Sequence, residues 1–176
     1  MERDGSNFDI DGGVSADTGA GARPLPSFRD RIIELRRVRA GELVPHPGKY
    51  RVHTGAQRAF LQAGLEEIGH ADALIAMRLP DGRLMLINGH MRADMDPHAW
   101  VPVLILDVTK EEADKLLLML DPIAEMAQRD SERIRALLST VQTENHALRD
   151  LFRQVAGNRI WELVHPDDIR DPARNP

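Results

Sequence analysis

The chain has 176 residues and a formal net charge of −5, with 42% hydrophobic residues but only 4% aromatic ones. This length suits one domain with an aliphatic core plus appendages rather than two full domains. The absence of cysteine excludes disulfides, thiol catalysis and cysteine metal sites, and the negative charge argues against a protein that coats nucleic acid by electrostatics alone.

The N-terminal stretch, residues 1–27, is rich in Gly, Asp and Ser and has neither helical nor strand periodicity. We predict that this segment is disordered, because it lacks the apolar residues that would form a core. It also lacks the hydrophobic run of a signal peptide, and no apolar run in the chain approaches the roughly 20 residues that a membrane-spanning helix needs. We therefore expect a cytoplasmic protein with no membrane contact.

Folded structure is predicted from residue 28, with a first strand that begins near Arg31. Three arginines, Arg36, Arg37 and Arg39, lie at the end of this strand. They are either a rim that meets a phosphate backbone or a nucleotide, or the solvated charges of an edge strand. We favour the edge strand, because charges there discourage stray pairing with other chains.

Residues 44–53 (VPHPGKYRVH) contain two prolines and a glycine, which exclude regular structure and predict a loop. Thr54 and Gln57 then fit a capping box, in which the threonine accepts a hydrogen bond from the third helical amide and the glutamine reaches back. The pattern predicts a helix that continues to about Ile68, with Gly69 as its C-terminal stop.

Two apolar runs, residues 73–77 and 84–87, flank the turn signal Pro80-Asp81-Gly82-Arg83 and predict a β-hairpin. The second run ends in Gly89-His90-Met91-Arg92. A glycine there lets a ligand approach the backbone closely, and an arginine offers a planar fork of donors that suits phosphate. The alternative interpretation of this stretch is a tight strand-to-helix corner with a solvated arginine.

The apolar run at residues 101–106 predicts a strand covered on both faces. A second capping box, Thr109 to Glu112, opens a helix through Leu120, which Pro122 must kink or end. Apolar residues at helical spacing between 130 and 156 then predict one helix of about 26 residues that packs on its own domain or on a partner chain.

The order of these elements resembles the N-terminal domain of the ParB and sulfiredoxin superfamily over about residues 31–126. The chain is most similar to ParB-like domains of phage and mobile-element proteins, which carry the label ParB-like nuclease domain and are often associated with DNA methyltransferases. Tyr50-Arg51-Val52-His53 resembles the Asn-Pro-Arg-x-His box, and Gly89-His90-Met91-Arg92 resembles the phosphate-binding box. The resemblance implies an α+β fold with a small mixed sheet and packed helices over 28–128. A C-terminal helical extension over 129–157 and a tail over 158–176 complete the predicted organisation.

The resemblance also implies a site for CTP or ATP with Mg²⁺. It assigns phosphate contacts to Gly89, His90 and Arg92, and it places Arg51, with His53 from the same box, across the cleft. Asp121 falls where similar domains hold magnesium, so it is the candidate metal ligand and catalytic residue. Without a cysteine the chain is not a sulfiredoxin, and the usual hydrolytic glutamate is missing from its place beside Asp121.

We therefore expect a nucleotide-binding switch or docking module in DNA modification, partition or mobile-element biology. Its predicted partners are a DNA-modifying protein such as a methyltransferase and a second copy bound through 130–156. Too few residues follow Met126 for a helix-turn-helix, so we do not expect sequence-specific DNA reading.

Three alternatives remain open. The first is a phosphoryl-transfer enzyme, kinase or nucleoside triphosphatase that uses a carboxylate near the phosphates, with Asp121, Asp94, Glu66 and Glu67 as candidates. The second is an interaction module with a vestigial nucleotide site. The third is a nuclease, which we favour least because the histidines lack the spacing of metal ligands.

Overall fold

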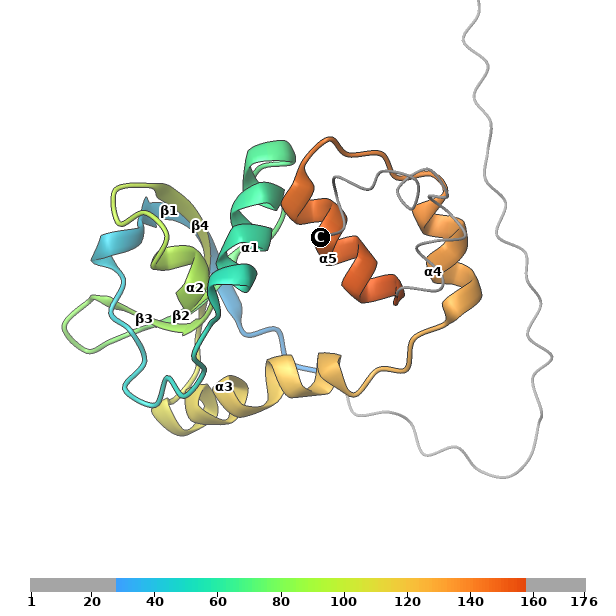
Figure 1. Cartoon of the computed structure of the whole chain (residues 1–176). Helices are drawn as coiled ribbons and strands as arrows, with labels where there is room; N and C mark the ends of the chain where they lie inside the picture. The colour runs from blue at the N-terminus through green and yellow to red at the C-terminus, as the bar shows by residue number, and fades with distance from the viewer. Residues whose placement is uncertain (1–27, 158–176) are drawn as a thin grey trace, which may run out of the picture. The chain divides into compact units, whose positions relative to one another are not determined.

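The computed structural model describes residues 28–157, so the predictions for 1–27 and 158–176 lie outside the described residues. The strands are β1 (Ile32–Arg39), β2 (Leu74–Arg78), β3 (Leu84–Asn88) and β4 (Trp100–Leu106) (Figure 1). The helices are α1 (Gly55–Glu67), α2 (His90–Ala93), α3 (Lys110–Glu125), α4 (Ser131–Leu138) and α5 (His146–Ala156), and a short 3-10 helix, η1, spans Ala40–Glu42.

The four strands form one mixed sheet in the order β1-β4-β2-β3. β1 runs antiparallel to β4, β2 and β3 form the antiparallel hairpin that the sequence predicts, and β2 runs parallel to β4. The parallel pair needs a crossover, which β3 and α2 supply between the two strands. These pairings confirm the α+β class with a small mixed sheet, and they place the arginine-rich β1 at an edge, as expected.

Both faces of the sheet are covered next to the hairpin, because alternate residues of β3 enter different cores. Leu84 and Leu86 belong to the core that β4 and α2 complete on one face. Met85 and Ile87 belong to the core on the other face, where α3 packs. β3 is therefore fixed on both sides, and the residues that follow it start from a rigid position.

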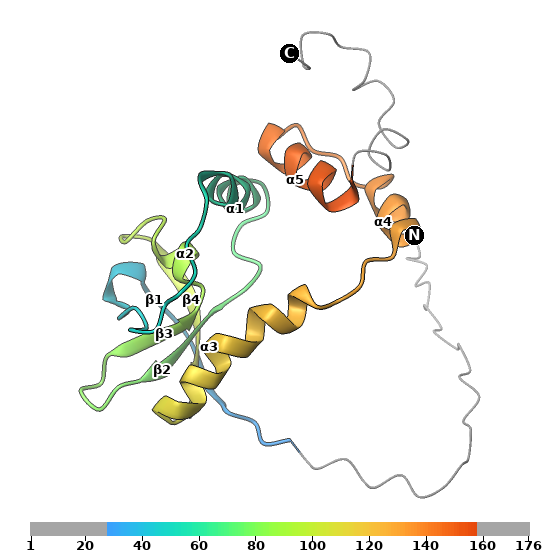
Figure 2. The ribbon, with the colours of Figure 1, turned by 60° about the horizontal axis from the view of Figure 1, so that its bottom comes forward.

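Both predicted capping boxes form. The Thr54 hydroxyl accepts from the Gln57 amide at 3.2 Å at the start of α1, and the Thr109 hydroxyl accepts from the Glu112 amide at 3.2 Å at the start of α3. α3 contains Pro122 and ends at Glu125, within one turn after the proline. Figure 2 shows α3 lying along the sheet with its C-terminal end directed toward the segment that leads to α4.

The prediction of a single long helix between 130 and 156 is wrong, because the chain forms two helices there, α4 and α5. Residues 139–145 break the helix. The hydroxyls of Ser139 and Thr140 donate to carbonyls of the preceding turn, which competes with helical pairing. The Asn145 side chain then accepts from two amides and starts a new helix. The apolar stripe in the sequence continued across this break, which is why it suggested one helix.

Replacing Asn145 by alanine should destabilise α5 by about 1 kcal/mol, because two amides at the helix start lose their acceptor. Hydrogen exchange of the α5 amides is the appropriate measurement. The neighbouring exposed Glu144→Ala is the control and should leave exchange in α5 unchanged. Equal exchange rates in both variants would show that Asn145 does not begin this helix.

The two C-terminal helices pack on the rest of the described chain through α1. α5 contacts both α1 and α4, and Figures 1 and 2 both show it beside α1. The Thr143 hydroxyl donates to the Glu67 carboxylate and joins the connection before α5 to the end of α1. Of the two packing modes that the sequence left open, own domain or partner chain, α5 shows the first.

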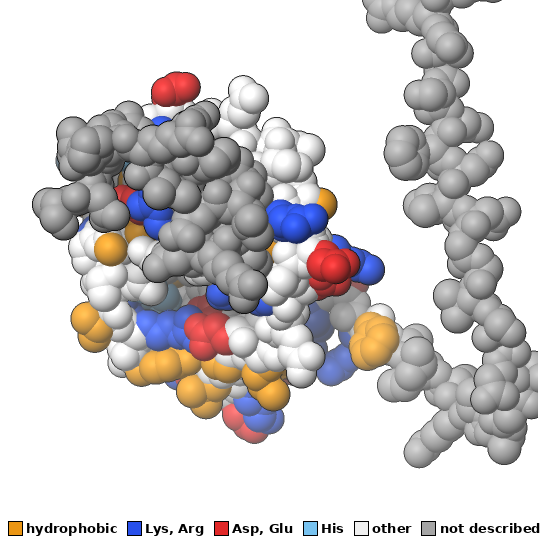
Figure 3. Space-filling model, turned by 45° about the vertical axis from the view of Figure 1, so that its right-hand side comes forward, with side chains coloured by type: hydrophobic (Ala, Val, Ile, Leu, Met, Phe, Trp, Pro, Cys, Tyr) orange, Lys and Arg blue, Asp and Glu red, His pale blue; other side chains and the backbone are white. Residues whose placement is uncertain are grey.

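The outer side of α3 leaves apolar side chains exposed. They are Leu118, Met119, Ile123 and Met126. Figure 3 shows hydrophobic side chains gathered along the lower edge of the view, the side on which α3 lies in Figure 1. No helix within the described part of the chain is both long and apolar enough to cross a membrane.

Candidate functional site

The turn between β3 and α2 strongly favours glycine. Gly89 has φ of 95°, a left-handed conformation that side chains disfavour. A Cβ built at this position would lie 2.7 Å from the Leu74 Cγ and 3.3 Å from an Arg92 guanidinium nitrogen. The glycine therefore lets the backbone pass close to β2. It also leaves room for the Arg92 guanidinium next to Gly89.

The Arg92 side chain is largely covered, with 14% of its surface exposed. Its Nη1 lies 3.0 Å from the Asp72 carboxylate, and its Nη2 donates to the Ala73 carbonyl at 3.5 Å. Asp72 is 78% exposed, so water screens this ion pair. A ligand anion at the turn can replace such a partner at small cost, whereas the position of the guanidinium is fixed by its burial.

The loop before α1 brings a second group of charged residues to the turn. Val44 pairs with both Leu84 and Leu86 of β3 and fixes the start of the loop on the sheet. Farther along, the Arg51 guanidinium lies 3.1 Å from the Asp121 carboxylate and 3.3 Å from the Glu125 carboxylate. The loop is thereby joined to the last turns of α3.

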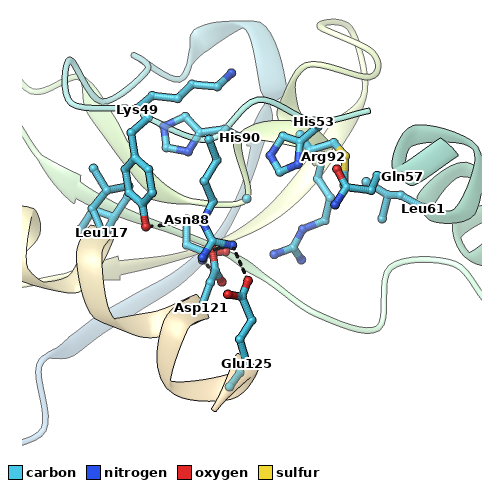
Figure 4. A pocket seen from close by; sticks show the side chains of 16 residues that line it. Lys49, His53, Gln57, Leu61, Asn88, His90, Arg92, Leu117, Asp121 and Glu125 are labelled. Carbon is cyan, nitrogen blue, oxygen red and sulfur yellow. Dashed lines mark hydrogen bonds and ion pairs between the residues drawn. The ribbon is translucent and has the colours of Figure 1, made fainter. Parts of the chain in front are cut away.

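These segments surround one cavity of about 390 Å³ (Figure 4). A cavity of this size is within the range of small-molecule and cofactor sites. The lining residues that carry charge or hydrogen-bonding groups are Lys49, Tyr50, Arg51, His53, Gln57, Asn88, His90, Arg92, Asp121 and Glu125. Apolar residues, including Leu61 of α1, Ile87 of β3 and Leu117 of α3, cover other parts of the wall. The cavity thus combines polar and apolar surfaces, as a nucleotide with phosphates and a base requires.

The cavity is locally more basic than the chain as a whole. Lys49, Arg51 and Arg92 are three lining cations, against the two lining carboxylates Asp121 and Glu125. The net charge of the chain is −5, so the cations are concentrated here against the overall trend. Each of these cations is ion-paired in the structure, Lys49 with Asp94, Arg92 with Asp72, and Arg51 with both lining carboxylates. An anionic ligand would therefore bind in exchange for these partners.

The His90 imidazole is buried beside this cavity and is neutral at physiological pH. Burial, with a smaller contribution from the Lys49 ammonium, lowers the pKa of His90 from 6.5 to about 4. Its Nε2 accepts a hydrogen bond from the His46 amide at 3.2 Å. An acceptor Nε2 places the ring proton on Nδ1. The ring therefore brings no positive charge to the site.

The lowered pKa makes stability depend on pH in a defined direction. The neutral form of His90 is favoured in the folded state, so its contribution is complete above pH 6.5 and is lost as pH falls toward 4. Between pH 7.5 and 4.5 we expect the wild-type chain to lose about 2–3 kcal/mol more than His90→Gln, which has no such titration. Urea unfolding at the two pH values measures this difference. Parallel losses in the two proteins would contradict it.

Asp121 accepts a hydrogen bond from the side-chain amide of Asn88 at 3.0 Å and also contacts Arg51. A magnesium ion that is also bound by nucleotide phosphates needs only one or two carboxylates from the protein. Asp121 and Glu125, one turn apart on α3, supply carboxylates at the cavity wall. The donor set therefore fits a phosphate-bound Mg²⁺, although the part of the chain that the structure describes contains no cluster of three or more His, Asp or Glu residues that could hold a metal alone.

All six residues that the sequence nominates line this one cavity: Arg51, His53, Gly89, His90, Arg92 and Asp121. Their roles stay predictions. Among the other carboxylates considered, Asp94 pairs with Lys49 at 2.6 Å, while Glu66 and Glu67 accept hydrogen bonds on α1. None of these three lines the cavity.

Sequence reasoning missed several lining residues. In the sequence, Asn88 only follows a predicted strand. No neighbouring residue indicates that its side-chain amide contacts Asp121 of α3. Lys49 and Gln57 also read as ordinary loop and capping residues. A signal was available for Glu125, since it lies four residues after Asp121 and therefore on the same side of α3.

No protein-family model matches the chain, and no curated protein matches it. Among solved structures it is similar to the crystal structure of the C-terminally truncated chromosome-partitioning protein ParB from Caulobacter crescentus, complexed with CTP-γ-S. The TM-score is 0.52 at 13% sequence identity, and the match covers 77% of this chain and 87% of that chain. This likeness shows a ParB-like fold.

Proposed function

We propose that this chain is a nucleotide-binding module of ParB-like fold that takes CTP or ATP together with Mg²⁺. The observation that carries the proposal is the cavity in which Arg92, beside the glycine turn, and Arg51, from the preceding loop, both line the wall. Two arginines from separate segments around a pocket of about 390 Å³ suit a polyphosphate ligand. The structurally similar ParB, which is complexed with CTP-γ-S, supports the choice of ligand class.

In this proposal Gly89 and Arg92 contact the phosphates, and Arg51 contacts them from across the cavity. His53, which lies on the same loop as Arg51, also lines the wall. Asp121 helps to hold Mg²⁺, which when bound offsets phosphate charge. The bound state then acts as a switch or docking module in a DNA-related process, with a DNA-modifying protein such as a methyltransferase as the proposed partner.

Calorimetric titration of CTP, ATP and GTP into the full chain, with and without Mg²⁺, tests the proposal. Saturable binding of one nucleotide, weakened in Arg51→Ala, is the expected result. An absence of binding for all three would overturn it and would favour an interaction module with a vestigial site. Sedimentation of the chain with and without the bound nucleotide would then test self-association, through either 130–156 or the exposed side of α3.

A second candidate function is nucleotide hydrolysis or phosphoryl transfer, and the position of Asp121 favours it. This is the lining carboxylate that contacts both Arg51 and Asn88. Such chemistry needs a carboxylate that holds a metal or accepts a proton near the phosphates. Phosphate release that is lost in Asp121→Asn would support the candidate, and no release from any nucleotide would exclude it.

A further inference from the structure

Two buried histidines connect the three segments that form the cavity. His90 lies on the glycine turn and is 8% exposed, and His46 lies on the loop before α1 and is 3% exposed. The His46 amide donates to His90 Nε2 at 3.2 Å. The imidazole of His46 faces α3, where its buried Nε2 lies 3.0 Å from the Asp114 carboxylate without the geometry of a hydrogen bond. The turn, the loop and α3 are thus joined through consecutive contacts.

The hydrogen bonds assign a ring proton to each histidine. His90 Nε2 is an acceptor, so its proton is on Nδ1. His46 Nδ1 accepts from the Gly48 amide at 3.0 Å, so its proton is on Nε2, the atom that faces Asp114. The two rings therefore have opposite tautomers, because His90 accepts from the loop backbone at Nε2 and His46 accepts from it at Nδ1.

The backbone of the loop between these contacts makes few hydrogen bonds of its own. Pro45 and Pro47 have no amide hydrogen, and residues 49–54 have no regular secondary structure. Apart from the Val44 bridge to β3, the backbone of this stretch is held by the hydrogen bond from the Lys49 amide to the His46 carbonyl at 3.0 Å. His46 therefore fixes the loop backbone ahead of Lys49 and Arg51, whose side chains are held further by their own ion pairs with carboxylates.

We propose that His90 and His46 are paired positioning residues, which hold the cationic loop at a fixed distance from the glycine turn, and that His90 does not itself bind phosphate. This inference rests on the proposed nucleotide site for its functional consequence. Its structural part, the anchored His46 amide, holds in the absence of any ligand. It departs from the role that the family resemblance gives His90.

The geometry explains why a neutral histidine suits this place. In the neutral ring, Nε2 of His90 accepts the hydrogen bond from the His46 amide. In an imidazolium, Nε2 would carry a proton and could not accept it. The charged groups around His90 are Lys49 and Asp94, with His46 and His53 as its titratable neighbours. Lys49 and Asp94 form an ion pair with each other at 2.6 Å, which leaves the His90 ring to its backbone partner.

The test compares His90→Leu, which removes the acceptor, with His90→Gln, whose side-chain oxygen can replace Nε2. We expect His90→Leu to weaken nucleotide binding about tenfold or more and His90→Gln to restore most of it. The exposed His70→Leu is the matched control and should bind as the wild type does. Equal losses in His90→Leu and His90→Gln would overturn the proposal and would make His90 a phosphate ligand.

Measurements on the free protein separate this proposal from the nucleotide site. Nitrogen NMR of the wild-type rings should show His90 protonated on Nδ1 and His46 protonated on Nε2. Exchange of the His46 amide should be at least about tenfold faster in His90→Leu than in His70→Leu. The opposite tautomer of His90, or an unchanged His46 amide, would overturn the anchor. A wild-type chain that binds no nucleotide would overturn the proposed function. The ring tautomers and the exchange of the His46 amide would still test whether His90 anchors that amide.

Discussion

Arg92→Ala is expected to lower the affinity of the chain for its nucleotide by roughly 10- to 100-fold. Each hydrogen bond to a charged group contributes about 1.5–3 kcal/mol, and 1.4 kcal/mol corresponds to tenfold in affinity. The guanidinium lies next to Gly89 and lines the cavity, so its removal takes away a fixed positive charge at the turn. Calorimetric titration of the variant with the nucleotide that the wild type binds best measures the loss.

Two further variants make this result specific. Arg83→Ala removes an arginine at the hairpin turn, where Arg83 pairs with Asp81 outside the cavity, and should leave binding unchanged. Arg92→Lys keeps the charge but not the planar fork, and it should give an intermediate affinity. Loss of the ion pair with Asp72 should contribute less than about 1 kcal/mol to any stability change in Arg92→Ala, because Asp72 is largely in water. Unchanged affinity in Arg92→Ala would remove the turn from the binding site.

Gly89→Ala should destabilise the folded chain by roughly 2–5 kcal/mol. The left-handed backbone at φ of 95° accounts for about 1–2 kcal/mol of this loss. Overpacking accounts for a further 1–3 kcal/mol or so, because the new Cβ would meet the Leu74 side chain at 2.7 Å. Leu74 is fully buried in the core and has little room to move. Urea unfolding at neutral pH measures the change.

Gly82→Ala is the matched control. Gly82 also has a left-handed backbone, with φ of 85°, but a Cβ there would meet nothing within 4 Å. Its substitution should therefore cost only the backbone strain, about 1–2 kcal/mol. The difference between the two variants isolates the close approach of the Gly89 turn to β2. Equal losses would mean that the turn is less tightly packed than the structure indicates.

Much of the fold could be predicted because its signals are local. The capping residues Thr54 and Thr109 fix the starts of α1 and α3, and the turn at residues 80–83 fixes the hairpin. The boundary between α4 and α5 was missed for a physical reason. An apolar stripe at helical spacing does not reveal that Ser139 and Asn145 redirect the backbone hydrogen bonds between two of its turns.

The site was only partly predictable from the sequence. Gly89 and Arg92 lie three residues apart in the chain, so a short motif is enough to predict that they lie close together. Contacts between distant segments cannot, since Asn88 meets Asp121 and His46 meets His90 only after the loop and α3 have packed on the sheet. The sequence also gave no sign that burial would make His90 neutral.

The most direct test of a nucleotide site at this cavity is an NMR titration of the full chain with CTP, ATP and GTP in the presence of Mg²⁺. We predict saturable shifts for one nucleotide, concentrated at the amides of Arg51, His53, Gly89, Arg92 and Asp121. The amides of the hairpin turn around Gly82 should not move. Shifts elsewhere on the surface, or none with any nucleotide, would contradict a site at the Gly89 turn.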